Sequence, residues 1–227
     1  NEKISVDNAA KVAMPKLHDK EIIRLEVNEV ADLLNCAESG TGMTPQQRAY
    51  HENTKIRDIA ILTLFLGTGI RISELVGLNN EDIDFTANSF IVTRKGGNKT
   101  ILYFSEEVAD ALAQYMAFKE DNKDIPEGEH ALFLSLQMKR ISVRAVENLV
   151  KKYSSIVTPL KKISPHKLRS TFGTQLYRET KDIYVVADVL GRKDVNTTKK
   201  HYAAISEDVR RSVAGKVQLR ESSTHNK

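Results

Sequence analysis

One segment of the sequence places an arginine where it would suit a phosphate group. Residues 67–75 (GTGIRISEL) contain two glycines, at which a buried helix is predicted to end, and Arg71 follows directly. Glycine allows the backbone to turn tightly and approach a ligand closely, and the planar Arg71 guanidinium matches phosphate oxygens. Glu74 is predicted to orient this guanidinium. Taken alone, the segment fits a surface Arg71–Glu74 ion pair even better.

A second segment, residues 164–171 (SPHKLRST), combines a helix start with a histidine and an arginine. Pro165 suits the first position of a helix, so His166 and Arg169 lie three residues apart on one face. The N-terminus of a helix attracts phosphate. The segment predicts a phosphate site with a titratable group, although a structurally satisfied His166 and a solvated Arg169 fit about equally well.

Two further segments contribute lysines and a tyrosine. Residues 94–99 (RKGGNK) form a predicted glycine-rich turn that carries Lys95, with Lys99 as a competing candidate. Residues 190–202 (LGRKDVNTTKKHY) are basic and lead to Tyr202. Each segment alone has a plainer explanation, namely a solvated turn lysine and a packing aromatic residue.

The elements that must position these residues are mostly helical. Asn28 is predicted to cap a first helix that ends at Gly40. A long helix from about Pro45 to Leu66 is predicted to stop at Gly67 and Gly69. The apolar face of the first helix is expected to comprise Val30, Leu33, Leu34 and Ala37.

A small antiparallel sheet is predicted in the middle of the chain. Residues 90–93 and 100–104 are β-rich runs on either side of the turn. Ser105 then caps a helix with acidic residues in its first turn. Other helices are expected near Ile72, Leu75 and Val76 and over residues 142–157, 165–179, 182–190, 194–203 and 206–219. The fold class is therefore α+β, a helical body with one small antiparallel sheet.

Composition narrows the class of protein. Residues 1–90 hold 9 Lys and Arg against 14 Asp and Glu, whereas residues 91–227 hold 25 against 16. A basic C-terminal half indicates a polyanionic partner, although a solvated basic surface fits too. Cys36 is the single cysteine, which excludes a disulfide framework and a cysteine metal cluster. No apolar run approaches the roughly 18 residues of a membrane span, so we expect a cytoplasmic protein without a metal or a membrane partner.

Together, in this order and spacing, the four segments resemble the tyrosine site-specific recombinases, or phage integrase family. Integrases of phages and conjugative transposons are the nearest likeness, which runs from about residue 19 to 215. The resemblance implies a catalytic domain that recombines or integrates double-stranded DNA, without cofactor or metal, through a 3′-phosphotyrosine intermediate. The catalytic residues it implies are Arg71, Lys95, His166, Arg169, Arg192 and Tyr202.

The resemblance also implies individual roles. Arg71 and Arg169 look like the pair that clamps the scissile phosphate, Lys95 like the general acid, and Tyr202 like the nucleophile. His166 is similar to the histidine of the H-x-x-R box. The basic residues expected to contact DNA are Lys99, Lys167, Lys193 and Lys199.

Arg192 departs from the family pattern, because most members carry His there and some carry Trp. Arginine keeps its proton at working pH and cannot act as an acid or base, but it can still donate hydrogen bonds to a phosphate. If the usual histidine only donates, Arg192 preserves the function. If proton transfer matters at this position, activity should be weak.

The family pattern also suggests a domain organisation. Residues 1–18 are expected to be a linker from a missing N-terminal DNA-binding domain, and residues 220–227 a polar tail. The helix at 206–219 is expected to dock on a neighbouring protomer in a tetramer on DNA, or else to pack on its own domain.

Two other functions fit parts of the pattern. A type IB topoisomerase shares the Arg, Lys, His and Tyr set, but residues 68–75 and the stretch around Arg192 look more like an integrase. A DNA-binding regulator built on a degenerate recombinase domain explains the charge and the helices as well. The complete set from Arg71 to Tyr202 argues against a regulator, and the departure at Arg192 keeps it open.

Overall fold

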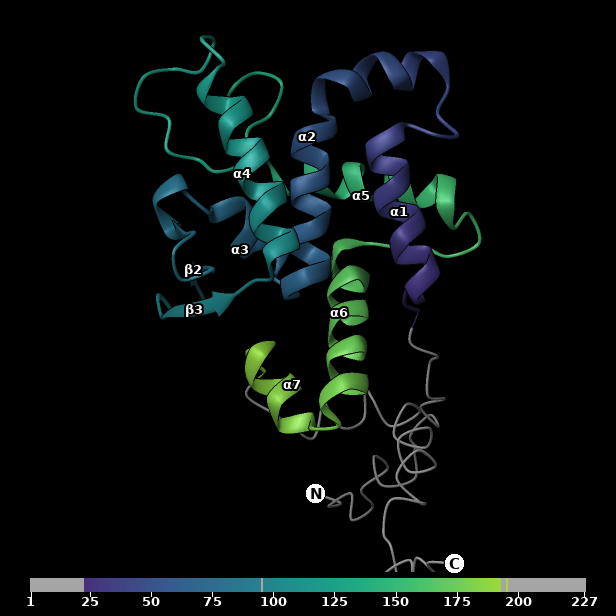
Figure 1. Cartoon of the computed structure of the whole chain (residues 1–227), viewed down its shortest axis with the longest axis vertical. Helices are drawn as coiled ribbons and strands as arrows, with labels where there is room; N and C mark the ends of the chain where they lie inside the picture. Colours follow the sequence, from purple (N-terminus) through teal and green to yellow (C-terminus); the bar gives the residue numbers. More distant parts are fainter. Residues whose placement is uncertain (1–22, 95, 193–194, 196–227) are drawn as a thin grey trace, which may run out of the picture.

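A computed structural model describes residues 23–94, 96–192 and 195. These residues form a helical body with a small sheet at one side (Figure 1). The helices are α1 (Val27–Ser39), α2 (Pro45–Thr68), α3 (Ile72–Gly77), α4 (Glu106–Glu120), α5 (Val143–Val157), α6 (Pro165–Thr180) and α7 (Ile183–Val189). The strands are β1 (Ile83–Asp84), β2 (Ser89–Thr93) and β3 (Lys99–Tyr103). The predicted α+β class is thereby confirmed.

Helix α2 forms the centre of this body, between α4 and α1 (Figure 1). Residues 60–66 near its C-terminal end are all buried. They join a core that includes Leu33 of α1, Leu112 of α4 and Leu168 of α6. A helix that is apolar on every side must be enclosed by neighbours, so the end of α2 is held in place by helices that pack around it.

The two glycines at the end of α2 differ in role, and the predicted helix end at Leu66 is wrong by two residues. Gly67 lies inside the helix, where an added Cβ would collide with Val108 of α4. It therefore allows close packing of α2 against α4. Gly69 caps the helix in the left-handed conformation with φ of 62°, and a Cβ there would collide with Phe172. The backbone can then turn sharply into Arg71.

The predicted cap of α1 is also wrong. The helix begins one residue earlier than Asn28, and Glu26 occupies the N-cap position. The Glu26 N–H donates to the carboxylate of Glu29 at 2.7 Å, and the Glu26 side chain accepts from the backbone N–H of Glu29 in return, which completes a capping box. The expected apolar face is confirmed: Leu33 and Ala37 are buried, with Val30 and Leu34 packed against the same core.

The sheet has the order β1-β2-β3 and is antiparallel throughout. The β2–β3 hairpin matches the prediction, with Thr93 paired to Lys99, and the short β1 strand was not predicted. The Arg94 N–H donates to the Asn98 carbonyl at 2.8 Å and closes the turn. This bond joins the two ends of the hairpin turn.

The remaining predicted helices are confirmed to within about two residues where the structure describes them. Pro165 occupies the first turn of α6, as expected, and the side chain of Ser142 accepts the cap bond of α5. Ser105 sits at the N-cap of α4, but its side chain makes no cap hydrogen bond. The helices expected at 194–203 and 206–219 lie outside the described residues, apart from Val195. Among those described, no helix has both the length and the apolar character needed to span a bilayer.

Candidate functional site

Arg71 lies where α2 ends and α3 begins, and it is held on two sides. Its Nη1 donates to Glu74 Oε1 at 2.6 Å, while its backbone N–H donates to Glu74 Oε2 at 2.9 Å. The Glu74 carboxylate is buried, with 4 % of its side chain exposed. The Arg71 Nη2 donates to the carbonyls of Leu190 and Gly191 at 3.1 and 2.9 Å. A guanidinium anchored at both ends has little conformational entropy left to lose on binding an anion.

Arg169 reaches the same place from α6 and is buried, with 7 % of the residue exposed. Its Nη1 donates to the Gly69 carbonyl and its Nη2 to the Leu190 carbonyl. Leu190 O therefore accepts from both Arg71 and Arg169, which brings two guanidinium groups to one point. Burial, followed by the charge of Arg71, lowers the pKa of Arg169 to about 10, so it still carries its charge at neutral pH.

His166 stands in the first turn of α6 and faces this arginine pair. A cavity of about 310 Å³ is lined by Ile70, Arg71, Ile72, Ser73, Pro165, His166, Arg169 and Arg192. Partial burial, followed by the positive charges of Lys167, Arg192 and Arg169, lowers the pKa of His166 below its ordinary value. The ring is therefore neutral at pH 7, and one ring nitrogen can accept a proton.

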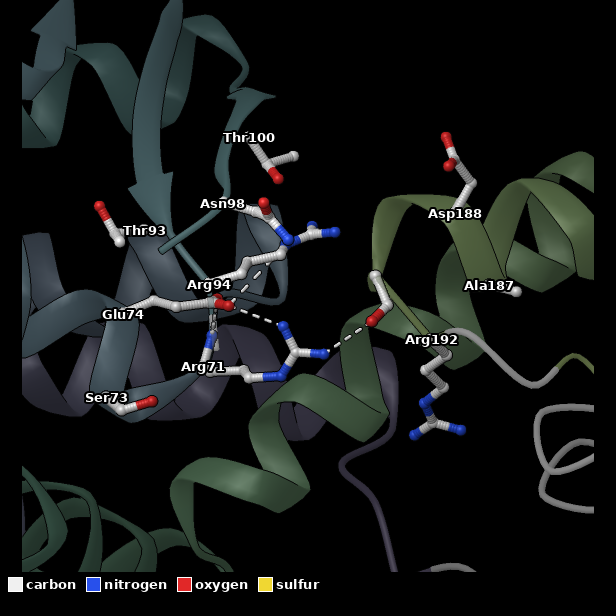
Figure 2. A pocket seen from close by; sticks show the side chains of 11 residues that line it. Arg71, Ser73, Glu74, Thr93, Arg94, Asn98, Thr100, Ala187, Asp188 and Arg192 are labelled. Carbon is white, nitrogen blue, oxygen red and sulfur yellow. Dashed lines mark hydrogen bonds and ion pairs between the residues drawn. The ribbon is translucent and has the colours of Figure 1, made fainter. Parts of the chain in front are cut away.

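Arg192 follows α7 and lines this cavity together with a second one of about 670 Å³. The second cavity lies between the hairpin, α3 and the end of α7. Figure 2 shows Arg71, Glu74 and Arg94 turned toward one another, whereas the Arg192 side chain points away from them. The arrangement leaves Arg192 beside both cavities and on the outer side of the arginine pair.

The structure brings together four of the six predicted catalytic residues, Arg71, His166, Arg169 and Arg192. Lys95, Lys193, Lys199 and Tyr202 lie outside the described residues. Lys99 is exposed at the start of β3 and does not line either cavity, and Lys167 is half-buried in α6 next to His166. Within the described part of the chain, no group of three or more His, Cys, Asp or Glu is placed to hold a metal ion.

Arg94 is the site residue that the sequence analysis missed. It lines the larger cavity beside Arg71, and its Nε lies 3.9 Å from the Glu74 Oε1 that Arg71 also contacts. The available signal was its place directly before Lys95 in the predicted glycine-rich turn. An arginine at the base of a glycine-rich turn has no distinctive pattern, so only the packing of the hairpin against α7 reveals its position.

Solved structures with the same fold support this description. The crystal structure of XerA recombinase matches with a TM-score of 0.70 and 23% identity, covering 94% of this chain and 69% of that one. A structure of XerH site-specific recombinase bound to a palindromic difH substrate matches with a TM-score of 0.69 and 16% identity, covering 87% and 54%. At these identities, the similarity establishes the fold.

Sequence comparison also identifies proteins that are related to this chain. Tyrosine recombinase XerC of Thermodesulfovibrio yellowstonii is 38% identical over 146 residues, which cover 63% of this chain and 48% of the relative. XerC of Caldanaerobacter subterraneus subsp. tengcongensis is 35% identical over 214 residues, covering 92% and 55%. The chain thus spans about half the length of these curated relatives. The phage integrase family model matches residues 24–208, and the chain belongs to the phage integrase family.

Proposed function

We propose that this chain carries out site-specific DNA recombination by cleaving and rejoining strands, with Tyr202 as the nucleophile. The observation that carries the proposal is the convergence of Arg71 and Arg169 on Leu190 O, in a cavity that His166 also lines. Arg71 comes from the junction of α2 and α3, and both His166 and Arg169 come from α6; three groups with these properties are what an attack on a phosphodiester requires.

The two arginines act on the charge of the reacting phosphate. A phosphodiester is anionic and repels a nucleophile, and its transition state concentrates negative charge on the two non-bridging oxygens. Fixed guanidinium donors stabilise that charge, and each such donor typically contributes about 10²–10³ in rate. Glu74 and the carbonyls of Leu190 and Gly191 hold the Arg71 guanidinium before substrate arrives.

Proton movement accompanies the two bond changes. The Tyr202 oxygen attacks phosphorus, the bond from phosphorus to the 5′ oxygen breaks, and a 3′-phosphotyrosine and a 5′ hydroxyl result. A free tyrosine is ionised only about once in a thousand at pH 7, so His166 is proposed to accept its proton. Lys95, or Lys99 in its place, is proposed to give a proton to the leaving 5′ oxygen. The phosphotyrosine is itself a phosphodiester, formed in exchange for the one that breaks, so a 5′ hydroxyl can attack it and rejoin the strand without a cofactor.

Relatives support DNA as the partner. The XerH structures contain difH substrate, and structures of the Tn1549 transposon integrase, at 20–23% identity, contain transposon-derived DNA. We propose residues 19–215 as the catalytic domain, residues 1–18 as a linker from a DNA-binding domain, and the 206–219 segment as a contact to other protomers in a tetramer on DNA. The expected place of action is the cytoplasm, where bacterial DNA is held.

The lowered pKa of His166 predicts a pH profile for strand cleavage. The group is neutral above its pKa, and that pKa lies below the ordinary value of about 6.5. Its capacity to accept a proton is therefore intact from pH 6.5 upward and is lost as the pH falls below that range. Single-turnover cleavage rates between pH 5 and 8 should show an acid limb only below pH 6.5, and His166→Gln should lower the rate and remove that limb. An acid limb centred above pH 6.5 that His166→Gln abolishes would contradict the assignment.

Replacing Arg192 with the residue usual in the family tests what this position does. Arg192 borders the reaction cavity and donates without losing its proton. If it acts only as a donor, Arg192→His should retain strand cleavage to within about tenfold, and Arg192→Ala should lose about 10²-fold. A loss of more than about 10²-fold in Arg192→His would show that the chain depends on the guanidinium itself.

The experiment that tests the proposed function traps the covalent intermediate. A nicked or phosphorothiolate-bearing duplex prevents religation, and a denaturing gel with peptide mapping locates the adduct. An adduct on Tyr202 supports recombinase chemistry, and relaxation of supercoiled DNA without strand exchange would instead support topoisomerase activity. DNA binding without an adduct, in the full-length protein on its own target site, would support a non-catalytic regulator.

A further inference from the structure

The two cavities taken together are more positive than one phosphodiester requires. The two cavities together are lined by Arg71, Arg94, Arg169 and Arg192, opposed by the carboxylates of Glu74 and Asp188. The balance is a net charge of +2, and His166 adds nothing while it is neutral. A single scissile phosphodiester supplies one negative charge. The remaining charge calls for a second anion nearby, because clustered cations without a counter-charge repel one another.

The proposed chemistry assigns no role to Arg94. Its Nη2 donates weakly to the Val189 carbonyl at 3.5 Å, and its Nε is 3.9 Å from Glu74 Oε1. Both distances are long for hydrogen bonds. The Nε is buried and has no hydrogen-bond partner among the described residues. Since Arg71 already takes Glu74 at 2.6 Å, Arg94 has strong donors that its present contacts barely use.

The surroundings of Arg94 suit a phosphate group. The hydroxyl or amide side chains of Ser73, Thr93, Asn98 and Thr100 line the same cavity. The Arg94 guanidinium lies close to Gly191, where any Cβ would collide with it, so the absence of a side chain at this glycine leaves room for the arginine in the cavity. About 20 % of the Arg94 side chain is exposed, which leaves part of it accessible to a ligand in the cavity.

We propose that this cavity is a second phosphate subsite, in which Arg94 binds a backbone phosphate next to the scissile one on the same DNA strand. The inference rests on the proposed function, and it names Arg94 as a residue that positions the strand. The two cavities share Arg71 and Arg192, so a ligand that fills one continues into the other. A DNA strand carries a phosphate for about every 3.4 Å along the helix axis, which gives a repeating anion that can occupy contiguous sites.

Binding to non-cognate DNA tests the subsite without relying on catalysis. The full chain is titrated into a labelled mixed-sequence duplex at 50–200 mM KCl, and log Kobs is plotted against log salt. Each phosphate neutralised contributes about −0.9 to the slope. Arg94→Gln should make the slope shallower by about 0.9 and weaken binding about tenfold near 100 mM salt. Arg94→Lys, which keeps the charge, should preserve the slope.

Two further variants test whether the effect comes from charge inside the cavity. Lys123→Gln removes one exposed positive charge in the segment after α4 and should leave the slope unchanged, apart from long-range screening effects. Asn98→Asp keeps Arg94 and adds a negative charge to the cavity, so it should weaken binding at least as much as Arg94→Gln. A wild-type slope in both Arg94→Gln and Asn98→Asp, with melting temperatures that show folded proteins, overturns the subsite.

A covalent-capture experiment identifies the phosphate that Arg94 binds. Trapping substrates carry one neutral methylphosphonate at each phosphate flanking the cleavage point. At one of these phosphates, the methylphosphonate should slow covalent capture by the wild type about tenfold. The same methylphosphonate should not slow capture by Arg94→Gln any further. If the methylphosphonates slow capture by Arg94→Gln equally at every position, the flanking phosphate is not the ligand of Arg94. Absence of any adduct in the wild type would instead contradict the proposed function, and the salt slopes would still report on the anion subsite.

Discussion

Tyr202→Phe is expected to abolish covalent capture of DNA and leave the affinity for DNA nearly unchanged. The substitution removes one oxygen, the atom proposed to bond to phosphorus. The arginines that bind the phosphate remain in place, since Arg71 and Arg169 are held by Glu74 and by the carbonyls of Gly69, Leu190 and Gly191. Trapping gels and anisotropy titrations on the same duplex measure the two effects separately.

A second tyrosine provides the matched control. Tyr103 lies on β3 with 70% of its surface exposed and takes no part in either cavity. Tyr103→Phe should therefore capture DNA at the wild-type rate. Capture by Tyr202→Phe at that same rate would remove the central claim, and a parallel loss of DNA affinity would mean that Tyr202 contributes to binding.

Arg169→Ala is expected to reduce the capture rate by about 10²–10³-fold and to destabilise the fold as well. The rate falls because one of two donors to the non-bridging oxygens is lost. Stability falls because Arg169 is buried and ties the end of α2, at Gly69, to the end of α7, at Leu190. Leaving a buried carbonyl without its donor costs about 1–3 kcal/mol. Single-turnover kinetics well below the melting temperature, with denaturant unfolding in parallel, measure both effects.

The same helix supplies the control for Arg169. Arg178 also lies on α6, but its side chain is 35% exposed and its Nη1 is 3.4 Å from Glu26 Oε2. Arg178→Ala should change stability by less than about 1 kcal/mol and leave the capture rate unchanged. Arg169→Lys should recover part of the stability and little of the rate, because an ammonium lacks the planar pair of donors. Full recovery of the rate in Arg169→Lys would mean that charge alone is needed at this position.

Patterns of local origin made the fold class predictable from the sequence. Pro165 starts α6, Ser142 caps α5, and alternating β-rich runs around a glycine-rich turn give β2 and β3. Two helix boundaries were predicted wrongly, one because of a distant neighbour and one because of a local cap. The end of α2 passes Gly67 because α4 packs against it there, and α1 starts before Asn28 because Glu26 and Glu29 form the cap.

The sequence by itself determined which residue types are available for phosphate chemistry, and the order and spacing of the four segments that carry Arg71, Lys95, His166, Arg169 and Tyr202 indicated the family. Only the tertiary structure decided how the arginines among them meet. Arg71 and Arg169 are separated by nearly 100 residues, and they converge because the carbonyl of Leu190 accepts from both. Arg94 lies beside them because the hairpin packs against the end of α7, where Arg94 contacts Val189 and Gly191. Guanidinium groups are long and their placement depends on which buried acceptors lie within reach, a property of packing that no local pattern encodes.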